Sequence, residues 1–294
     1  MIGYQTQIDE LAFAEQSQAT AIKVIGYPFP STWEKLARLA DLGVTIILRP
    51  WVANQALDNP QQRAQALAQE VIGKVPSKRP SRLYVEGYNE MLGADYGEWT
   101  AYYAEALARA GLRHIAYNFS TGSPYASDWP RYLEGLRVTQ RYGGGLGLHE
   151  YWKAAPGESD TVGHRQVVSV LPSDLKQIPI WVTEAGVDRA LITASGWRSI
   201  LSPAQYAAQL VSYGQLLAAS RAQGVNLQGA TLFGAGMTAM WSSFELLGQG
   251  QDVTGAALRQ VNGRYIKPYS LGGGERSGNW VLAGLLGAAI LVSL

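Results

Sequence analysis

The chain of 294 residues contains no cysteine and only three histidines, His114, His149 and His164. The absence of cysteine excludes disulfides, thiol catalysis and thiolate metal sites. The histidines are scattered and show neither HxH nor HExxH spacing, which argues against a histidine-based metal centre. We therefore expect a function that requires neither a metal nor another cofactor.

A strong charge of one sign is also missing. The chain has 24 Lys and Arg against 23 Asp and Glu, a formal net charge of +1, so polyanions are not generally attracted and we expect no nucleic-acid partner. Five Phe stand against nine Trp and sixteen Tyr. Aromatic rings with a polar edge suit a wet, concave, sugar-binding surface, although barrel cores use them as well.

The two ends of the chain differ in character. The start, MIGYQTQIDE, has neither the basic nor the apolar segment of a secretory signal, so we expect no signal peptide. A glycine-rich linker is expected over residues 269–279, followed by the uncharged apolar segment Trp280–Leu294. This segment is shorter than the roughly 20 residues that cross a bilayer comfortably. A membrane anchor and a tail packed on protein both stay open; an anchor would suit a cell-envelope or extracellular substrate.

Short apolar runs alternate with helical patterns at a spacing of roughly thirty residues, which is typical of a parallel sheet with crossover helices. The eight runs are residues 2–6, 21–26, 44–49, 83–88, 114–119, 145–151, 178–183 and 229–233. Eight such units favour a closed barrel over an open sheet. We therefore predict an α/β protein with a single-domain (β/α)₈ TIM barrel over residues 1–268.

Helix signals between the runs support this order. Ser31 to Glu34 form a capping box, which predicts a helix that runs to about residue 42 and ends at Gly43. Proline or aspartate at the start and glycine at the end predict the other helices. These are residues 60–71, 95–110, 128–142 and 203–223.

The ends of three runs are unusually polar, and in this architecture active sites gather at the carboxyl ends of the strands. The fourth run leads into Glu86-Gly87-Tyr88-Asn89-Glu90, the sixth ends in His149-Glu150-Tyr151-Trp152, and the seventh leads into Thr183-Glu184-Ala185-Gly186. Glu90 and Glu184 would then face one pocket. Paired carboxylates of this kind are what cleavage of a glycosidic bond requires.

The segments Tyr-Val-Glu-Gly-Tyr-Asn-Glu at 84–90 and Ile-Trp-Val-Thr-Glu-Ala-Gly at 180–186 resemble the clan A glycoside hydrolases. The resemblance covers the barrel from residue 1 to about residue 250. It implies retaining double displacement, with Glu90 as general acid/base and Glu184 as nucleophile. It also implies that Asn89 contacts the sugar 2-hydroxyl and that Tyr151 or His149 holds the nucleophile.

Two departures from that clan leave the family within it open. Met91 stands where a proline usually follows the Asn-Glu pair, and the last run ends Leu232-Phe233-Gly234 where the clan commonly has a tryptophan. Trp241, from the loop that follows, could take the place of that tryptophan. We predict that it contacts the substrate.

Other residues near the strand ends are expected to support the site or to bind sugar. Glu86 lies two side-chain periods before Glu90 and should point into the barrel, where an unpaired carboxylate is costly; its best partner is Arg49. Trp51 and Trp152 directly follow strands, so each is expected either to stack on sugar or to plug the barrel mouth. Glu150 and Asp188 are expected to be structural and loop residues, respectively.

The leading hypothesis is hydrolysis of a β-linked polysaccharide or oligosaccharide, with glucan, mannan, xylan and peptidoglycan all open. Modest loop lengths favour an open cleft and endo cleavage. One alternative is a non-catalytic carbohydrate-binding barrel. Another is a barrel hydrolase that uses carboxylates with a divalent metal, although the strand ends do not assemble an obvious ligand set.

Overall fold

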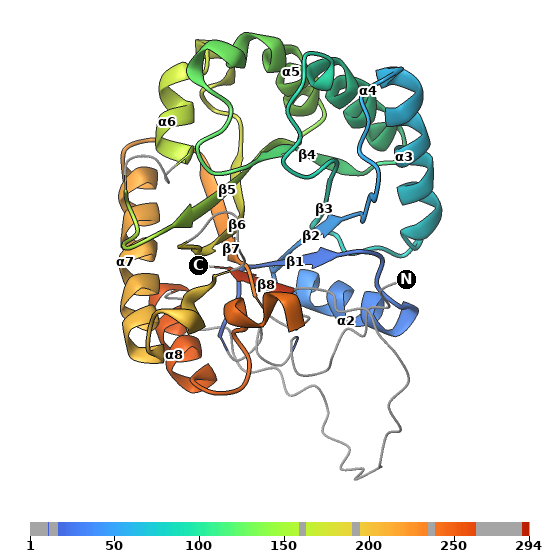
Figure 1. Ribbon diagram of the computed structural model, residues 1–294. Coiled ribbons are helices and arrows are strands. Elements are labelled where there is room, and N and C mark those ends of the chain that lie inside the picture. The colour runs from blue at the N-terminus through green and yellow to red at the C-terminus, as the bar shows by residue number, and fades with distance from the viewer. Residues whose placement is uncertain are drawn as a thin grey trace.

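The computed structural model describes residue 11 and residues 17–158, 163–189, 195–234, 239–262 and 290–293. In this part of the chain the strands form a closed barrel in the order β1 to β8, with helices arranged around it (Figure 1). The strands are β1 (Ala21–Ile25), β2 (Thr45–Arg49), β3 (Leu83–Glu86), β4 (Arg113–Phe119), β5 (Gly145–Trp152), β6 (Ile180–Val187), β7 (Leu227–Leu232) and β8 (Ile290–Ser293). The predicted TIM-barrel fold class is confirmed.

The helices are α2 (Pro30–Asp41), α3 (Pro60–Lys74), α4 (Tyr96–Arg109), α5 (Leu133–Arg141), α6 (Gly163–Val170), α7 (Pro203–Ala222) and α8 (Gln251–Asn262). Short 3₁₀ turns include η1 (Ala126–Tyr132), η3 (Trp197–Ser199) and η4 (Ala239–Phe244). The four helices predicted at 60–71, 95–110, 128–142 and 203–223 correspond to α3, α4, η1 with α5, and α7.

The capping box predicted at Ser31–Glu34 is wrong. Helix α2 begins at Pro30, its N-cap is Phe29, and no side chain caps it. Proline fits the first turn of a helix because its φ is already helical and its missing N–H is not needed there, so the helix starts before the predicted cap. A capping box does occur at α7, where the Ser202 side chain accepts a hydrogen bond from the backbone N–H of Gln205.

The last strand of the barrel comes from the apolar carboxyl-terminal segment. β8 runs antiparallel between β7 and β1, whereas the other neighbouring strands pair in parallel. Four residues of Trp280–Leu294 are therefore hydrogen-bonded into the sheet, which gives no support to a membrane anchor. No helix among the described residues is long and apolar enough to span a bilayer. The predicted strand 2–6 and the linker 269–279 lie outside the described residues.

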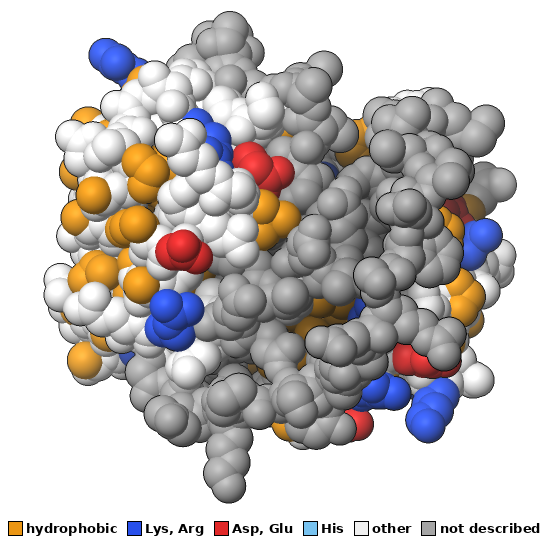
Figure 2. All heavy atoms as spheres, turned by 90° about the horizontal axis from the view of Figure 1, so that it is seen from below, with side chains coloured by type: hydrophobic (Ala, Val, Ile, Leu, Met, Phe, Trp, Pro, Cys, Tyr) orange, Lys and Arg blue, Asp and Glu red, His pale blue; other side chains and the backbone are white. Residues whose placement is uncertain are grey.

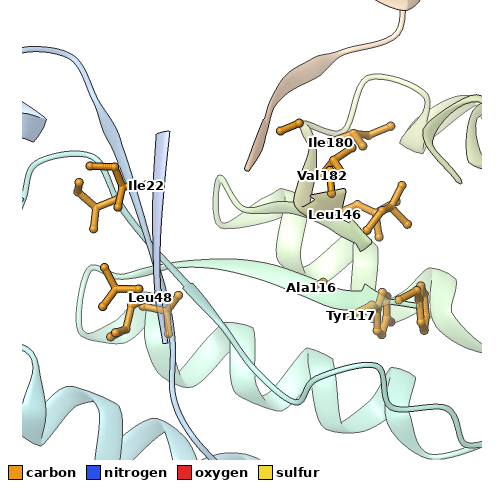
Figure 3. Close-up of a cluster of buried hydrophobic side chains, with 14 of the residues drawn as sticks. Ile22, Leu48, Ala116, Tyr117, Leu146, Ile180 and Val182 are labelled. Carbon is orange, nitrogen blue, oxygen red and sulfur yellow. The ribbon is translucent and has the colours of Figure 1, made fainter. Parts of the chain in front are cut away.

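Side chains alternate along the strands between two apolar clusters. Those that point outward pack against the helices in the main core, and Figure 3 labels several of them, including Ile22, Leu48, Leu146 and Val182. Positions of the opposite parity point into the barrel, as alternation along a strand requires. Four of them form a separate inner cluster of Ala21, Ile47, Ile115 and Trp181, with Tyr84 packed on it. The inner cluster lies toward the amino ends of the strands.

Charged side chains of both signs are interspersed over the described surface shown in Figure 2. That distribution matches the balanced composition.

We predict that His114 weakens the fold in acid. Burial lowers the pKa of its imidazole from 6.5 to about 3, so below pH 6.5 the unfolded chain binds a proton that the folded chain refuses. The free energy of unfolding should then fall with decreasing pH, by up to about 1.4 kcal/mol per pH unit from this group. The test is urea denaturation of the wild type and of His114→Phe at several pH values. This substitution keeps a ring against Tyr103 and removes the titrating imidazole, so the fall in unfolding free energy should be smaller in the variant. A stability difference between the two proteins that does not change with pH would contradict the prediction.

Candidate active site

A β-bulge in β6 turns Glu184 into the barrel. Val182 pairs with Leu148 of β5, but the next pair is Glu184 with His149, so β6 contains one extra residue at Thr183. The pairing with β7 shifts by one residue over the same stretch. Because a shift of one residue reverses the face on which later side chains lie, the bulge places Glu184 on the inner face together with His149.

Three strands supply the groups that hold the Glu184 carboxylate. Its Oε1 lies 2.9 Å from Lys23 Nζ and 2.7 Å from Arg49 Nη1. Its Oε2 accepts a hydrogen bond of 2.8 Å from the Tyr151 hydroxyl. Only 6% of the side chain is exposed. The carboxylate is thus desolvated and paired on both oxygens.

Two opposing effects act on the ionisation of Glu184. Burial on its own would raise the pKa of this carboxyl, but the positive charges of His149, Lys23 and Arg49, with the hydrogen bond from Lys23, outweigh burial. The pKa is held well below its usual range, so Glu184 is an ionised group in a site with little water. Burial and the negative charge of Glu184 raise the pKa of the neighbouring Tyr151 hydroxyl, which keeps it a hydrogen-bond donor.

Glu90 lies in a different environment, in the loop that follows β3. Its backbone has a left-handed φ of 53°, and its N–H donates to the Asn118 carbonyl at 3.2 Å. Asn118 and Tyr117 are themselves left-handed, at a register shift in β4. Such backbone strain in residues other than glycine is costly and clusters at functional sites. The Glu90 side chain is 37% exposed, so it faces the open end of the site.

His149 joins the two glutamates. Its Nδ1 lies 2.7 Å from Glu90 Oε1 and 3.6 Å from Glu184 Oε2. Because both distances are measured from the same nitrogen, the two carboxylate oxygens are at most 6.3 Å apart, which is 2.7 Å plus 3.6 Å. A buried, ionised carboxylate and a partly exposed one therefore face each other across a short gap.

The four residues at the end of β5 divide by parity. His149 and Tyr151 point inward and contact Glu184, as expected for residues two apart. Glu150 points outward and is structural, as predicted: it accepts hydrogen bonds from the His164 backbone N–H and from the Tyr213 hydroxyl.

Trp152 is not available to a sugar, which corrects one of our expectations. It shares the outward parity of Glu150, is 1% exposed, and donates its indole N–H to Gln209 on α7 at 2.7 Å. Its ring packs on Tyr213. Trp152 therefore belongs to the core between β5 and α7. Its position directly after the predicted strand suggested contact with sugar, but its outward parity places it under α7.

The predicted Glu86–Arg49 pair is also wrong. Glu86 is buried as expected, but its Oε2 pairs with Lys23 Nζ at 2.8 Å. Arg49 instead binds Glu184 and donates from Nη1 to Asn89 Oδ1 at 2.7 Å. Asn89 is thereby placed beside the nucleophile candidate, and Gln55 holds its backbone on the other side.

Sequence reasoning missed Lys23 as a site residue. It lies in the middle of the apolar strand β1, and its side chain is fully buried. A lysine flanked by apolar residues in a strand covered on both faces needs a buried acidic partner. This need for a buried acidic partner is the sequence signal that could have identified Lys23 as a site residue.

The two other tryptophans remain exposed after strand ends. Trp51 is 57% exposed, two residues beyond Arg49. Trp241 in η4 is 38% exposed and lies edge-on to Phe233, which in turn contacts Tyr151. Trp241 is thus connected to the site through one ring.

The two buried carboxylates of the site pair with cations of the site. Lys23 and Arg49 already pair with Glu86 and Glu184. No group of three or more His, Asp or Glu residues suited to a metal ion occurs in the described ranges.

Comparisons with known proteins support the architecture. No protein-family model matches the sequence, and a search of curated proteins finds no match. Among solved structures, a glucosidase from Croceicoccus marinus is similar with a TM-score of 0.57 at 12% identity over 86% of this chain and 63% of its own. This chain thus spans less than two thirds of the length of that glucosidase.

Two further similar structures match this chain over more than four fifths of their own length. A broad-specificity endoglucanase of glycoside hydrolase family 5 from an uncultured bacterium has a TM-score of 0.52 at 12% identity, over 88% of this chain and 85% of its own. A family 5 glycoside hydrolase from Prevotella bryantii has a TM-score of 0.52 at 14% identity, over 88% and 87%. At this identity the likeness shows the fold.

We predict very different losses of stability for two tryptophan substitutions. Trp152→Ala should lower the free energy of unfolding by about 3–5 kcal/mol, because it empties a buried position and leaves Gln209 without its donor. Trp51→Ala should change it by less than about 0.5 kcal/mol, because the ring is exposed. Denaturant unfolding of both variants measures this, and equal losses would show that the assignment of the two rings is wrong.

Proposed function

We propose that this chain is a retaining glycoside hydrolase in which Glu184 is the nucleophile and Glu90 the general acid/base. The observation that supports this most is that Glu90 Oε1 and Glu184 Oε2 both lie near the same His149 nitrogen, which keeps these two oxygens within 6.3 Å of each other. Retaining enzymes keep the two carboxyl groups about 5–5.5 Å apart, whereas inverting enzymes leave about 6.5–9.5 Å for a water molecule.

The two glutamates differ in the way that the two roles demand. Glu184 is buried and ionised, with its orientation set by Arg49 and Tyr151. Glu90 is partly exposed, where a leaving group and then a water molecule can reach it. Asn89, fixed by Arg49, lies next to both and is suited to donate to a sugar hydroxyl.

The reaction follows in two displacements. A Glu184 oxygen forms a bond to the anomeric carbon as the bond to the leaving oxygen breaks, and Glu90 gives its proton to that oxygen. A water molecule then attacks the same carbon, loses a proton to Glu90 and releases Glu184. Glu90 thus acts as an acid in the first displacement and as a base in the second.

We propose a β-linked glycan longer than a disaccharide as the substrate. Four exposed aromatic side chains, Phe29, Trp51, Tyr125 and Trp241, stand on segments that follow the carboxyl ends of β1, β2, β4 and β7. Rings on this rim offer stacking surfaces beyond the sugar unit that is cleaved. Similar structures include endoglucanases and a xyloglucanase, which makes a β-glucan the first substrate to test. Endo cleavage, and a substrate in the cell envelope or outside the cell, remain predictions.

The first prediction from this proposal concerns the two glutamates. Wild type should hydrolyse a member of a panel of aryl β-glycosides and β-glucans, and Glu184→Gln should abolish the reaction because amide oxygen is a poor nucleophile. Glu90→Gln should lose about 10²–10⁴-fold on glucans, but less on nitrophenyl glycosides, whose leaving group needs no proton. NMR of the first product should show the β anomer.

A matched control is Glu134→Gln, which removes a carboxylate that is 67% exposed and lies on α5. It should leave the rate unchanged. If Glu90→Gln and Glu184→Gln behave like this control, the assignment of the site is wrong. An α-configured first product would refute the retaining mechanism, and sugar binding without cleavage by wild type would favour a non-catalytic binding barrel.

The second prediction concerns the aromatic rim. Trp51→Ala and Trp241→Ala should raise KM for long oligosaccharides by about three- to tenfold, or ~0.6–1.4 kcal/mol of binding. They should leave KM for short aryl glycosides unchanged, because such substrates do not reach the rim. Tyr142→Ala is the control: this ring is 39% exposed and lies before β5, at the other end of the barrel. A change that is equal for long and short substrates would argue against rim subsites.

A further inference from the structure

A buried ion pair lies directly beneath the proposed nucleophile, and the mechanism above does not use it. Lys23 of β1 and Glu86 of β3 both have side chains with no exposed surface, and their charged atoms are 2.8 Å apart. The same Lys23 nitrogen is 2.9 Å from Glu184 Oε1. One ammonium group therefore bridges two carboxylates that come from different strands.

Stability alone is a poor reason for this arrangement. Removing a lysine and a glutamate from water is energetically costly, and apolar side chains of similar size often stabilise such positions as well or better. Neither Glu86 oxygen accepts a hydrogen bond from the described residues, and Oε2 has only the ion pair with Lys23. The inner cluster shows that apolar residues are accepted in the interior of this barrel, including Ala21 on the same strand.

The contacts around Glu184 are divided between its two oxygens. Oε1 carries both cations, Lys23 and Arg49. Oε2 accepts from Tyr151 and is the oxygen placed 3.6 Å from His149, on the side of Glu90. Since a sugar must lie between the two glutamates, Oε2 is the oxygen that faces it.

We propose that Lys23, held by Glu86, is a positioning residue that fixes Glu184 Oε1 and so presents Oε2 to the anomeric carbon. This rests on the proposed function. Arg49 and Tyr151 each hold one oxygen of the carboxylate. Lys23 adds a second cation on Oε1 from the neighbouring strand β1, so that this oxygen is held from two directions. Glu86 pairs with the same ammonium group at 2.8 Å and so keeps it in place beside Glu184.

The test separates this role from a merely structural one. The double variant Lys23→Met/Glu86→Gln removes both charges together and so avoids leaving a buried carboxylate unpaired. With a substrate identified, its kcat should fall at least tenfold while KM changes by less than threefold, because the substrate still binds but meets a misaligned nucleophile. Lys74→Met, on the exposed end of α3, is the control for the loss of a lysine.

A second readout requires no sugar. Carboxyl ¹³C NMR of glutamate-labelled protein, with the Glu184 signal assigned by Glu184→Gln, follows ionisation directly. The groups that face this carboxylate are Lys23, Arg49, His149, Tyr151 and, across the gap, Glu90. Losing Lys23 removes one of the positive charges, so Glu184 in the double variant should begin to titrate at a higher pH than in wild type.

The outcomes distinguish the two proposals. If kcat and the Glu184 titration both match wild type, Lys23 does not position the nucleophile and the inference falls. If no glycan is cleaved by wild type but the titration moves, the Lys23–Glu184 coupling stands and the proposed function fails. Should the double variant not fold, the Lys23 ¹⁵Nζ resonance is compared in wild type and Glu184→Gln; an unchanged resonance would overturn the inference.

Discussion

The interior of a closed barrel leaves little water to solvate a charge, so each inward-pointing charged side chain needs a partner from another strand. Glu184 meets this condition with Lys23 from β1, Arg49 from β2 and Tyr151 from β5. Glu86 from β3 completes the set through Lys23. Each contact is possible only when the strands have their present order and register. The polar network therefore depends on the barrel, and it also penalises any register that would separate its members.

Two irregularities in the sheet make this network possible. The bulge at Thr183 brings Glu184 to the inner face, and the left-handed pair Tyr117 and Asn118 brings the Asn118 carbonyl to the N–H of Glu90. The two are connected, because the Thr183 hydroxyl donates to Asn118 Oδ1 at 3.2 Å. Regular strands would close an equally good barrel, but they would turn one of the two glutamates away from the other. Each bulge interrupts the regular pairing of its strand with a neighbour, and this interruption allows the site residues to lie where they do.

Alternation along strands made much of the site predictable from sequence. Inward Glu86, His149 and Tyr151 and outward Glu150 all follow from parity and from the rule that strand ends carry the chemistry. The same rule applied without exception would have placed Trp152 correctly. What parity could not decide was the partner of Glu86, because Lys23 and Arg49 both point inward and the choice depends on the heights of neighbouring strands in the barrel.

Other features lay beyond local sequence signals. The pairing of Ile290–Ser293 with β7 and β1 joins residues far apart in the chain, and hydrophobicity alone does not distinguish a barrel strand from a short anchor. A bulge such as that at Thr183 leaves no mark in the apolar pattern that precedes it. The sequence offers two starts for α2, at Pro30 and at the capping box of Ser31–Glu34. The helix begins at Pro30, and local sequence alone does not decide between the two.

The departure from the clan's motif at Met91 has a conformational explanation. A proline at that position would push Glu90 toward extended backbone, since the residue before a proline is restricted by its ring. Glu90 here is left-handed, and its N–H is fixed to the Asn118 carbonyl. The irregularity in β4 thus holds the Glu90 backbone, and the Glu90 carboxylate contacts His149 Nδ1 at 2.7 Å. Because the main core lies between the strands and the helices, outside this site, such exchanges alter the way a glutamate is aimed without altering the barrel that carries it.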